Sequence, residues 1–134
     1  MAETAVAIAR TKAADRGVDA EFVVGDALHL DRLGRVFDTV LDCGLFHTFD
    51  SDERRQYVTS LASVTGRGGN VYVLCFSDLG PPDTCGPHPV SQEELRAPFD
   101  LSRGWSVVSV DPDRLRTRSH EEGVPAWVAK VERV

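Results

Sequence analysis

Residues 70–76 read NVYVLCF, the most continuously apolar stretch of the chain. A run rich in β-branched and aromatic residues, without alternating polar positions, is typical of a strand covered on both faces of a sheet. Gly66, Gly68 and Gly69 come just before it, and we expect them to end a preceding helix. The stretch therefore predicts a buried strand in a sheet that has helices packed on its faces.

Two more apolar segments precede this strand, and segments of helical period alternate with them. Val36 to Asp42 is an expected strand, and Glu21 to Gly25 is an earlier and shorter one. An alanine-rich helix is expected over residues 2–16, ending at Gly17. A second helix, capped by Ser51, precedes the glycines.

The remainder of the chain continues the alternation and then closes with two strands. Residues 77–90 form a loop rich in proline and glycine, and Ser91 with Glu94 forms a capping box that opens a helix reaching Phe99. Residues 105–110 and 124–131 read as two antiparallel strands. The order predicts a single α/β domain over residues 1–134, with a mostly parallel sheet and an antiparallel C-terminal strand.

Composition and charge limit the classes of partner. The net charge is −6 and the 15 Lys and Arg are scattered, which argues against a nucleic-acid interface. No apolar run is long enough to span a bilayer. The three cysteines follow no disulfide framework spacing, which favours reduced thiols and a cytoplasmic location. A small-molecule partner is expected.

Small and acidic residues stand where the expected strands end, at 25–27, 42–44 and 76–78. In open α/β sheets, ligands bind beyond the carboxyl ends of the strands, so we expect the chemistry along this edge. His47 follows the second of these ends. It is expected either to act on the substrate, as a general base or by orienting it, or to be a packed histidine bonded to loop backbone. Cys43 is expected to be a buried structural thiol rather than a nucleophile.

Two Cys/His pairs fall short of a zinc site. Cys43 with His47 and Cys85 with His88 are loosely spaced. A structural zinc site needs four ligands, usually in Cys-x₂₋₄-Cys units, so no metal is expected.

The order of these segments resembles the class I S-adenosylmethionine-dependent methyltransferases. The segments are FVVGDALHL (22–30), FDTVLDCGLFHTF (37–49), GRGGNVYVLCF (66–76) and the paired closing strands. Within that family, three features are similar to the thiopurine and halide/thiol methyltransferase group: the D-x-G turn at 42–44, DERRQY (52–57) and GPHPVSQEEL (86–95).

The resemblance implies S-adenosylmethionine as the cofactor and a small acceptor such as a thiol or another soft nucleophile. It implies that the Asp26 carboxylate accepts the adenine amino group and that the Ala27 amide meets a ring nitrogen. The alternative for Asp26 is a helix cap or Asx-turn. Asp42, Cys43 and Gly44 would then form the floor of the cofactor site.

The same resemblance gives the substrate side of the site. His47 would face the acceptor, and Phe46 would either wall the pocket or fill the core. Pro87 and His88 lie in a rigid loop that could cover the transferred methyl group and exclude water.

One part of the family pattern has no counterpart here. Members open with a strand, a G-x-G-x-G loop and a second strand that ends in an acidic residue, and none of these occurs in the chain. The resemblance therefore implies an incomplete sheet, in which the strands at 21–25 and 36–42 would stand roughly 14–15 Å apart. Their edges would be exposed, paired with each other, or covered by a homodimer or a complementing segment.

Two functions follow from this interpretation. The first is a methyltransferase domain that acts on a small molecule. The second is a catalytically inactive remnant that dimerises or binds a partner.

Overall fold

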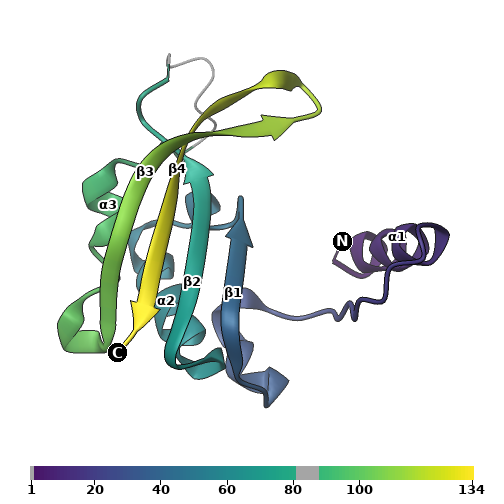
Figure 1. Ribbon diagram of the computed structural model, residues 1–134, viewed down its shortest axis with the longest axis horizontal. Coiled ribbons are helices and arrows are strands. Elements are labelled where there is room, and N and C mark those ends of the chain that lie inside the picture. The colour runs from purple at the N-terminus through teal and green to yellow at the C-terminus, as the bar shows by residue number, and fades with distance from the viewer. Residues whose placement is uncertain (1, 81–87) are drawn as a thin grey trace.

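The computed structural model describes residues 2–80 and 88–134. The helices and strands follow one another along the chain as in Figure 1. Their bounds are α1 (Ala2–Asp15), η1 (Ala27–Leu33), β1 (Phe37–Cys43), η2 (Phe46–Thr48), α2 (Ser51–Val64), β2 (Thr65–Phe76), α3 (Gln92–Arg96), η3 (Leu101–Arg103), β3 (Trp105–Thr117) and β4 (His120–Arg133).

The four strands form one mixed sheet in the order β1-β2-β4-β3. β1 pairs with β2 in parallel, with Val40 opposite Val71 and Cys43 opposite Leu74. β4 is antiparallel to both of its neighbours, β2 and β3. The predicted α/β class with its antiparallel C-terminal strand is confirmed. The balance of pairs differs from a mostly parallel sheet, since the described residues form one parallel and two antiparallel pairs.

The core lies between the sheet and the helices α2 and α3, which pack on the same face of it (Figure 1). Alternate residues of β2, namely Val71, Val73 and Cys75, are fully buried against this helical layer. The residues between them are only half-buried. The prediction that both faces of this strand are covered is therefore wrong for the described residues. One face of β2 packs against the helical layer, and the other face is only partly covered.

The start of α2 and the start of β2 both differ from the sequence prediction. Asp50, not Ser51, caps α2, in a reciprocal capping box with Glu53. The helix ends at Val64, and β2 begins at Thr65, so the glycines lie inside the strand. A Cβ on Gly69 would stand 2.8 Å from the Gly66 carbonyl oxygen, so the close approach of the backbone here requires glycine.

The segment 21–25 was predicted as a strand and is not one. Among the described residues it has no pairing partner, and Val23 and Val24 are each 51% exposed. Apolar residues in extended backbone form a strand only where a neighbouring strand takes their hydrogen bonds. The helix α1 before it has no buried residue and stands apart from the sheet in Figure 1.

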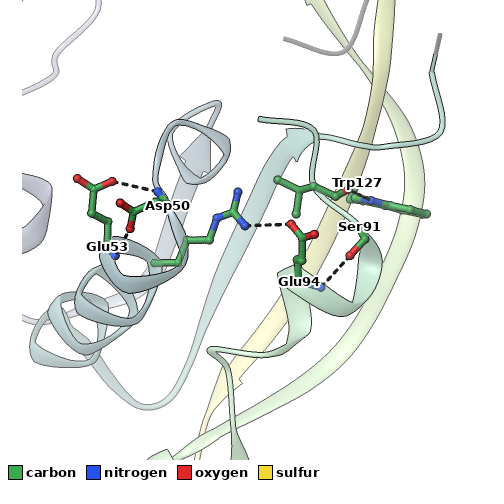
Figure 2. A network of polar contacts seen from close by, with 7 residues as sticks. Asp50, Glu53, Ser91, Glu94 and Trp127 are labelled. Atoms are coloured by element: carbon green, nitrogen blue, oxygen red, sulfur yellow. Dashed lines mark hydrogen bonds and ion pairs between the residues drawn. The ribbon is translucent and has the colours of Figure 1, made fainter. Parts of the chain in front are cut away.

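Two contacts join α2 and β4 to the segment around α3, which follows the 77–90 loop. Figure 2 shows Ser91 accepting a hydrogen bond from the Glu94 amide, which is one of the two bonds of the predicted capping box. The helix α3 ends at Arg96, before the predicted Phe99. Glu94 pairs with Arg54 of α2 at 3.2 Å, and Trp127 donates from Nε1 to the Val90 carbonyl at 2.9 Å. The C-terminal end of the loop is thus fixed to the core.

Candidate functional site at the carboxyl ends of β1 and β2

Asp42 organises the turn that follows β1. Its side chain is buried, and its Oδ1 accepts the Leu45 amide at 2.8 Å. Its Oδ2 accepts the Phe46 amide and the Tyr57 hydroxyl, each at 3.1 Å. Both carboxylate oxygens are therefore occupied by the protein itself, and Asp42 fixes the path of the chain rather than offering a free base.

Burial changes the ionisation of the groups around Asp42. It raises the pKa of Asp42 above its ordinary value of 3.8, while the hydrogen bonds from Leu45, Tyr57 and Phe46 work in the opposite direction. Burial, and then the charge of Asp42, raises the pKa of Tyr57. The same two causes raise the pKa of Cys75 to about 12, so this thiol is unreactive.

His47 bridges the ends of the two strands. Its Nδ1 accepts a hydrogen bond from the Phe76 amide at 3.1 Å, and its ring stacks on the Phe76 ring with centroids 4.1 Å apart. Burial, with a smaller contribution from the positive charge of Arg54, lowers the pKa of His47 below 6.5. An Nδ1 that accepts a backbone N–H leaves the proton of a neutral ring on Nε2. In this state the ring is a donor and not a base.

Gly44 and Cys43 form the end of β1. Gly44 has φ +90°, a conformation that other residues rarely adopt, and its amide donates to the Leu74 carbonyl at 2.9 Å. Cys43 was predicted to be buried, and this is wrong, because it is an exposed free thiol. Cys43 alternates with the buried Asp42 and so lies on the face of the edge strand that the helices leave open.

Phe46 belongs to the core and not to an open pocket wall. It is fully buried, its ring centroid is 6.3 Å from that of Phe99, and the Arg54 guanidinium lies 5.0 Å over its centre. Of the two alternatives predicted for Phe46, the structure favours the filling of the core. Arg54 and Tyr57 were not predicted as site residues, although both belong to the DERRQY segment (52–57).

Asp26 and Ala27 stand where the chain enters η1. Asp26 caps this helix, and its Oδ1 accepts the Leu28 amide at 2.9 Å. Ser60 of α2 holds the next turn, because its hydroxyl donates to the Ala27 carbonyl at 2.7 Å and accepts the Leu30 amide at 2.8 Å. The polar segment that leads toward β1 is therefore a short helix that packs on α2. The sequence signal for this helix is Asp26, whose predicted alternative role as a helix cap is confirmed.

The adenine end of the expected cofactor has matching groups at this turn. Asp26 is exposed, and within residues 2–80 and 88–134 only Oδ1 of its carboxylate has a hydrogen-bond partner, which leaves Oδ2 able to accept an amino group. The residues present thus fit the adenine part of S-adenosylmethionine.

The predicted substrate loop is described only in part. His88 is exposed, while Pro87 lies outside the described residues, as does Cys85. Within the described ranges no cluster of three or more His, Cys, Asp or Glu side chains could hold a metal ion. In the same part of the chain, none of the helices combines the length and apolar character needed to cross a membrane.

Comparison with known proteins places this geometry in a family. The methyltransferase domain family matches residues 1–69 of the 134. The 2-heptyl-1-hydroxyquinolin-4(1H)-one methyltransferase of Mycobacteroides abscessus is 37% identical over 116 residues, which are 85% of this chain and 50% of that protein.

Solved structures share the fold. A protein studied for the conversion of a disulfide bond into a thioacetal group during echinomycin biosynthesis has a TM-score of 0.81 and 33% identity, covering 97% of this chain and 62% of that one. The magnesium protoporphyrin IX methyltransferase of Synechocystis, solved with bound SAM, shares the fold at a TM-score of 0.64 and 18% identity, over 96% of this chain and 54% of that one. The chain thus spans between half and two thirds of these relatives, and it belongs to the methyltransferase domain family, whose class I members use S-adenosylmethionine as their cofactor.

Proposed function

We propose that the protein carrying this domain transfers a methyl group from S-adenosylmethionine to a small-molecule acceptor. The observation that carries the proposal is the 37% identity over 85% of the chain to a methyltransferase that acts on a hydroxyquinolinone. The carboxyl ends of β1 and β2, joined by His47 and Phe76, give the reaction a location that agrees with the general rule for open α/β sheets.

Each residue of the site has a proposed role, which the family resemblance implies and its surroundings allow. Asp26 and the Ala27 amide hold the adenine ring, and the backbone of Asp42, Cys43 and Gly44 lines the floor of the site. The sulfonium of the bound cofactor supplies an activated methyl group, so the protein contributes mainly orientation and exclusion of water.

The role proposed for His47 is orientation of the acceptor. Because Nδ1 accepts the Phe76 amide, a neutral ring presents the Nε2 proton, which can donate to an acceptor oxygen or sulfur lone pair that is not attacking the methyl group. His88 and Pro87 belong to the loop that would lie over the acceptor.

Two nucleophilic atoms are proposed for the acceptor, a sulfur and the oxygen of an N-hydroxyl. The similarity of segments 42–44, 52–57 and 86–95 to the thiopurine and halide/thiol group supports a sulfur acceptor. The name of the relative from Mycobacteroides abscessus gives a 1-hydroxyquinolinone as its acceptor, which supports an oxygen nucleophile such as the N-hydroxyl of that molecule. We favour the N-hydroxyl, because that relative is a methyltransferase of stated acceptor that aligns with 85% of the chain.

A second function is supported by the outer edge of β1. Within the described residues no strand pairs with this edge, and Leu41 beside it is 70% exposed. Unpaired edges invite pairing with another chain, so an inactive remnant that dimerises, or a domain whose sheet is completed by another segment, fits the same surface. In either case the chain by itself holds only part of a cofactor site. The free thiols Cys43 and Cys75 support a cytoplasmic location.

Two measurements test these proposals together. Calorimetry of the 134-residue chain with S-adenosylhomocysteine is expected to give a dissociation constant no tighter than about 1 mM, equivalent to roughly −4 kcal/mol. A micromolar constant would contradict the view that the cofactor site is incomplete. Sedimentation of the same sample reports whether the chain is a dimer.

The activity is tested in a fusion protein. In it, the part of the Mycobacteroides abscessus relative that precedes the aligned region is joined to the N-terminus of this chain. The acceptor series is a set of 2-alkyl-1-hydroxyquinolin-4(1H)-ones with tails from methyl to heptyl, together with an aryl thiol of similar size. Methylation of the hydroxyquinolinones supports the proposal. A folded fusion that binds the cofactor and methylates neither class overturns it in favour of the remnant.

A further inference from the structure

The hairpin of β3 and β4 continues well beyond the other strands. β2 ends at Phe76, which pairs with Ala126, while β3 and β4 remain paired out to Thr117 and His120. Figure 1 shows this distal part, residues 111–125, bending across the top of the sheet toward the side on which β1 lies. The carboxyl end of β1 is at that same edge.

One side chain of the distal hairpin reaches the site proposed above. A Cβ built on Gly44 would lie 3.9 Å from Cδ2 of Leu115 and 3.7 Å from Cε1 of His47. Leu115 is half-buried, whereas its neighbours Arg114 and Arg116 are exposed. Leu115 therefore points inward over the end of β1, and its methyl group and the His47 ring both lie within van der Waals distance of the point that a Gly44 side chain would occupy.

The hairpin is held in this position by contacts of its own. Arg114 donates from Nε to the Glu122 carbonyl at 2.8 Å and from Nη2 to the Gly123 carbonyl at 2.7 Å. Gly123 has φ +87°, and a Cβ there would stand 2.9 Å from Cβ of Arg114, so only glycine leaves room for this crossing. Val124, which pairs with Leu115, is buried. Contacts within the hairpin thus fix the position of Leu115 without a ligand.

The geometry points to Leu115 as a specificity-determining residue, an apolar wall that limits the size of the acceptor substituent beside Gly44 and His47. This inference rests on the function proposed above, because it takes the end of β1 as the place where the acceptor meets the methyl group. An apolar wall favours acceptors with a ring or alkyl group at that point and excludes charged ones. The exposed Arg114 contributes to this wall only through the hydrogen bonds that hold the hairpin.

The first test measures acceptor preference in the fusion described above. Leu115→Ala is expected to raise kcat/KM for the longest tail relative to the shortest by about tenfold, and Leu115→Phe to lower the same ratio, since each methylene in an apolar pocket changes discrimination by about 10-fold or more. Leu101→Ala is the size-matched control, because Leu101 is exposed in η3, which precedes the opposite end of β3. It is expected to leave the ratio unchanged. An unchanged ratio in both Leu115 variants of an active fusion overturns the inference and leaves the proposed function standing.

The second test does not depend on methyl transfer. In the 134-residue chain, NMR with labelled Leu methyl groups is expected to show contacts from Leu115 to His47 and Gly44, and shift changes at Leu115 that grow with the tail length of the added hydroxyquinolinone. If Leu115 shows these shift changes but the fusion protein is inactive, the acceptor wall is supported and the proposed activity is not. Absence of the contacts, or shift changes elsewhere only, overturns the wall whatever the activity.

Discussion

The amide of Phe76 donates to Nδ1 of His47 at 3.1 Å, and the two rings stack with only 7° between their planes. This pair joins the turn after β1 to the last residue of β2. A side chain that sequence suggested for chemistry thus has a structural task as well, and the two roles are separable by substitution.

Replacement of His47 tests both roles. His47→Ala leaves the Phe76 amide without its acceptor and removes the stacked ring, so we expect a loss of about 1–3 kcal/mol in the free energy of unfolding. His47→Asn offers an oxygen near the Nδ1 position and is expected to recover part of that loss. In the active fusion, His47→Ala should lower turnover more than cofactor affinity. A rate unchanged in His47→Ala would limit His47 to packing.

The stability of the chain should depend on pH through His47. Its pKa is lowered by burial and by Arg54, so the unfolded chain takes up this proton more readily than the folded chain. The stabilisation from a neutral His47 is therefore complete above the unfolded value of 6.5 and is lost as pH falls from 6.5 toward the folded pKa. Urea unfolding of wild type and His47→Asn between about pH 7.5 and 5.5 should show the difference between them shrinking on acidification. A constant difference would contradict a neutral buried ring.

Tyr57→Phe removes the hydroxyl that donates to Oδ2 of Asp42. The buried carboxylate keeps its two amide donors, so the expected loss is about 1–2 kcal/mol in the free energy of unfolding. The pKa of Asp42 should also rise further, because a hydrogen bond that favours its charged form is gone. Tyr72→Phe is the matched control, since within the described residues the Tyr72 hydroxyl has no hydrogen-bond partner. Equal losses of unfolding free energy in the two variants would show that the Tyr57 hydroxyl does not stabilise Asp42.

The Arg54–Glu94 ion pair should be worth more than an exposed pair. The Arg54 side chain is 8% exposed, and Glu94 is 55% exposed. We expect Glu94→Gln to cost about 0.5–1 kcal/mol in the free energy of unfolding, less at high salt because the Glu94 side is open to solvent. Glu21→Gln is the control, because its pair with Arg35 is exposed on both sides. Chemical denaturation of both variants at two salt concentrations is the measurement, and a larger loss in Glu21→Gln would be the contrary result.

Gly44→Ala should destabilise the end of β1 through its backbone alone. The added methyl group has room, but φ +90° is unfavourable for alanine by about 1–2 kcal/mol. Gly25→Ala is the control, because a Cβ there meets nothing within 4 Å and no positive φ applies. Thermal unfolding should show a lower midpoint in Gly44→Ala only. Similar midpoints in the two variants would mean that the turn can relax.

The sequence by itself determined the α/β class and the order of the main elements that follow segment 21–25. Those inferences held because the apolar runs at 36–42 and 70–76 and the cap at Ser91 are local signals that tertiary contacts do not reverse. The edge at which ligands bind stays a prediction. The resemblance of 22–30, 37–49 and 66–76 to a family also followed from order and spacing along the chain.

The tertiary structure alone decided the features that depend on distant neighbours. Segment 21–25 is strand-like in composition yet is not a strand, because a strand exists only where a second one takes its hydrogen bonds. Cys43 is exposed because β1 is the edge strand and its outer face lacks cover among the described residues. No local pattern brings Leu115 to Gly44, seventy-one residues apart (115 − 44), or sets the His47 ring on Phe76. Local composition decides which elements form, and the packing of one element on another decides which side chains meet.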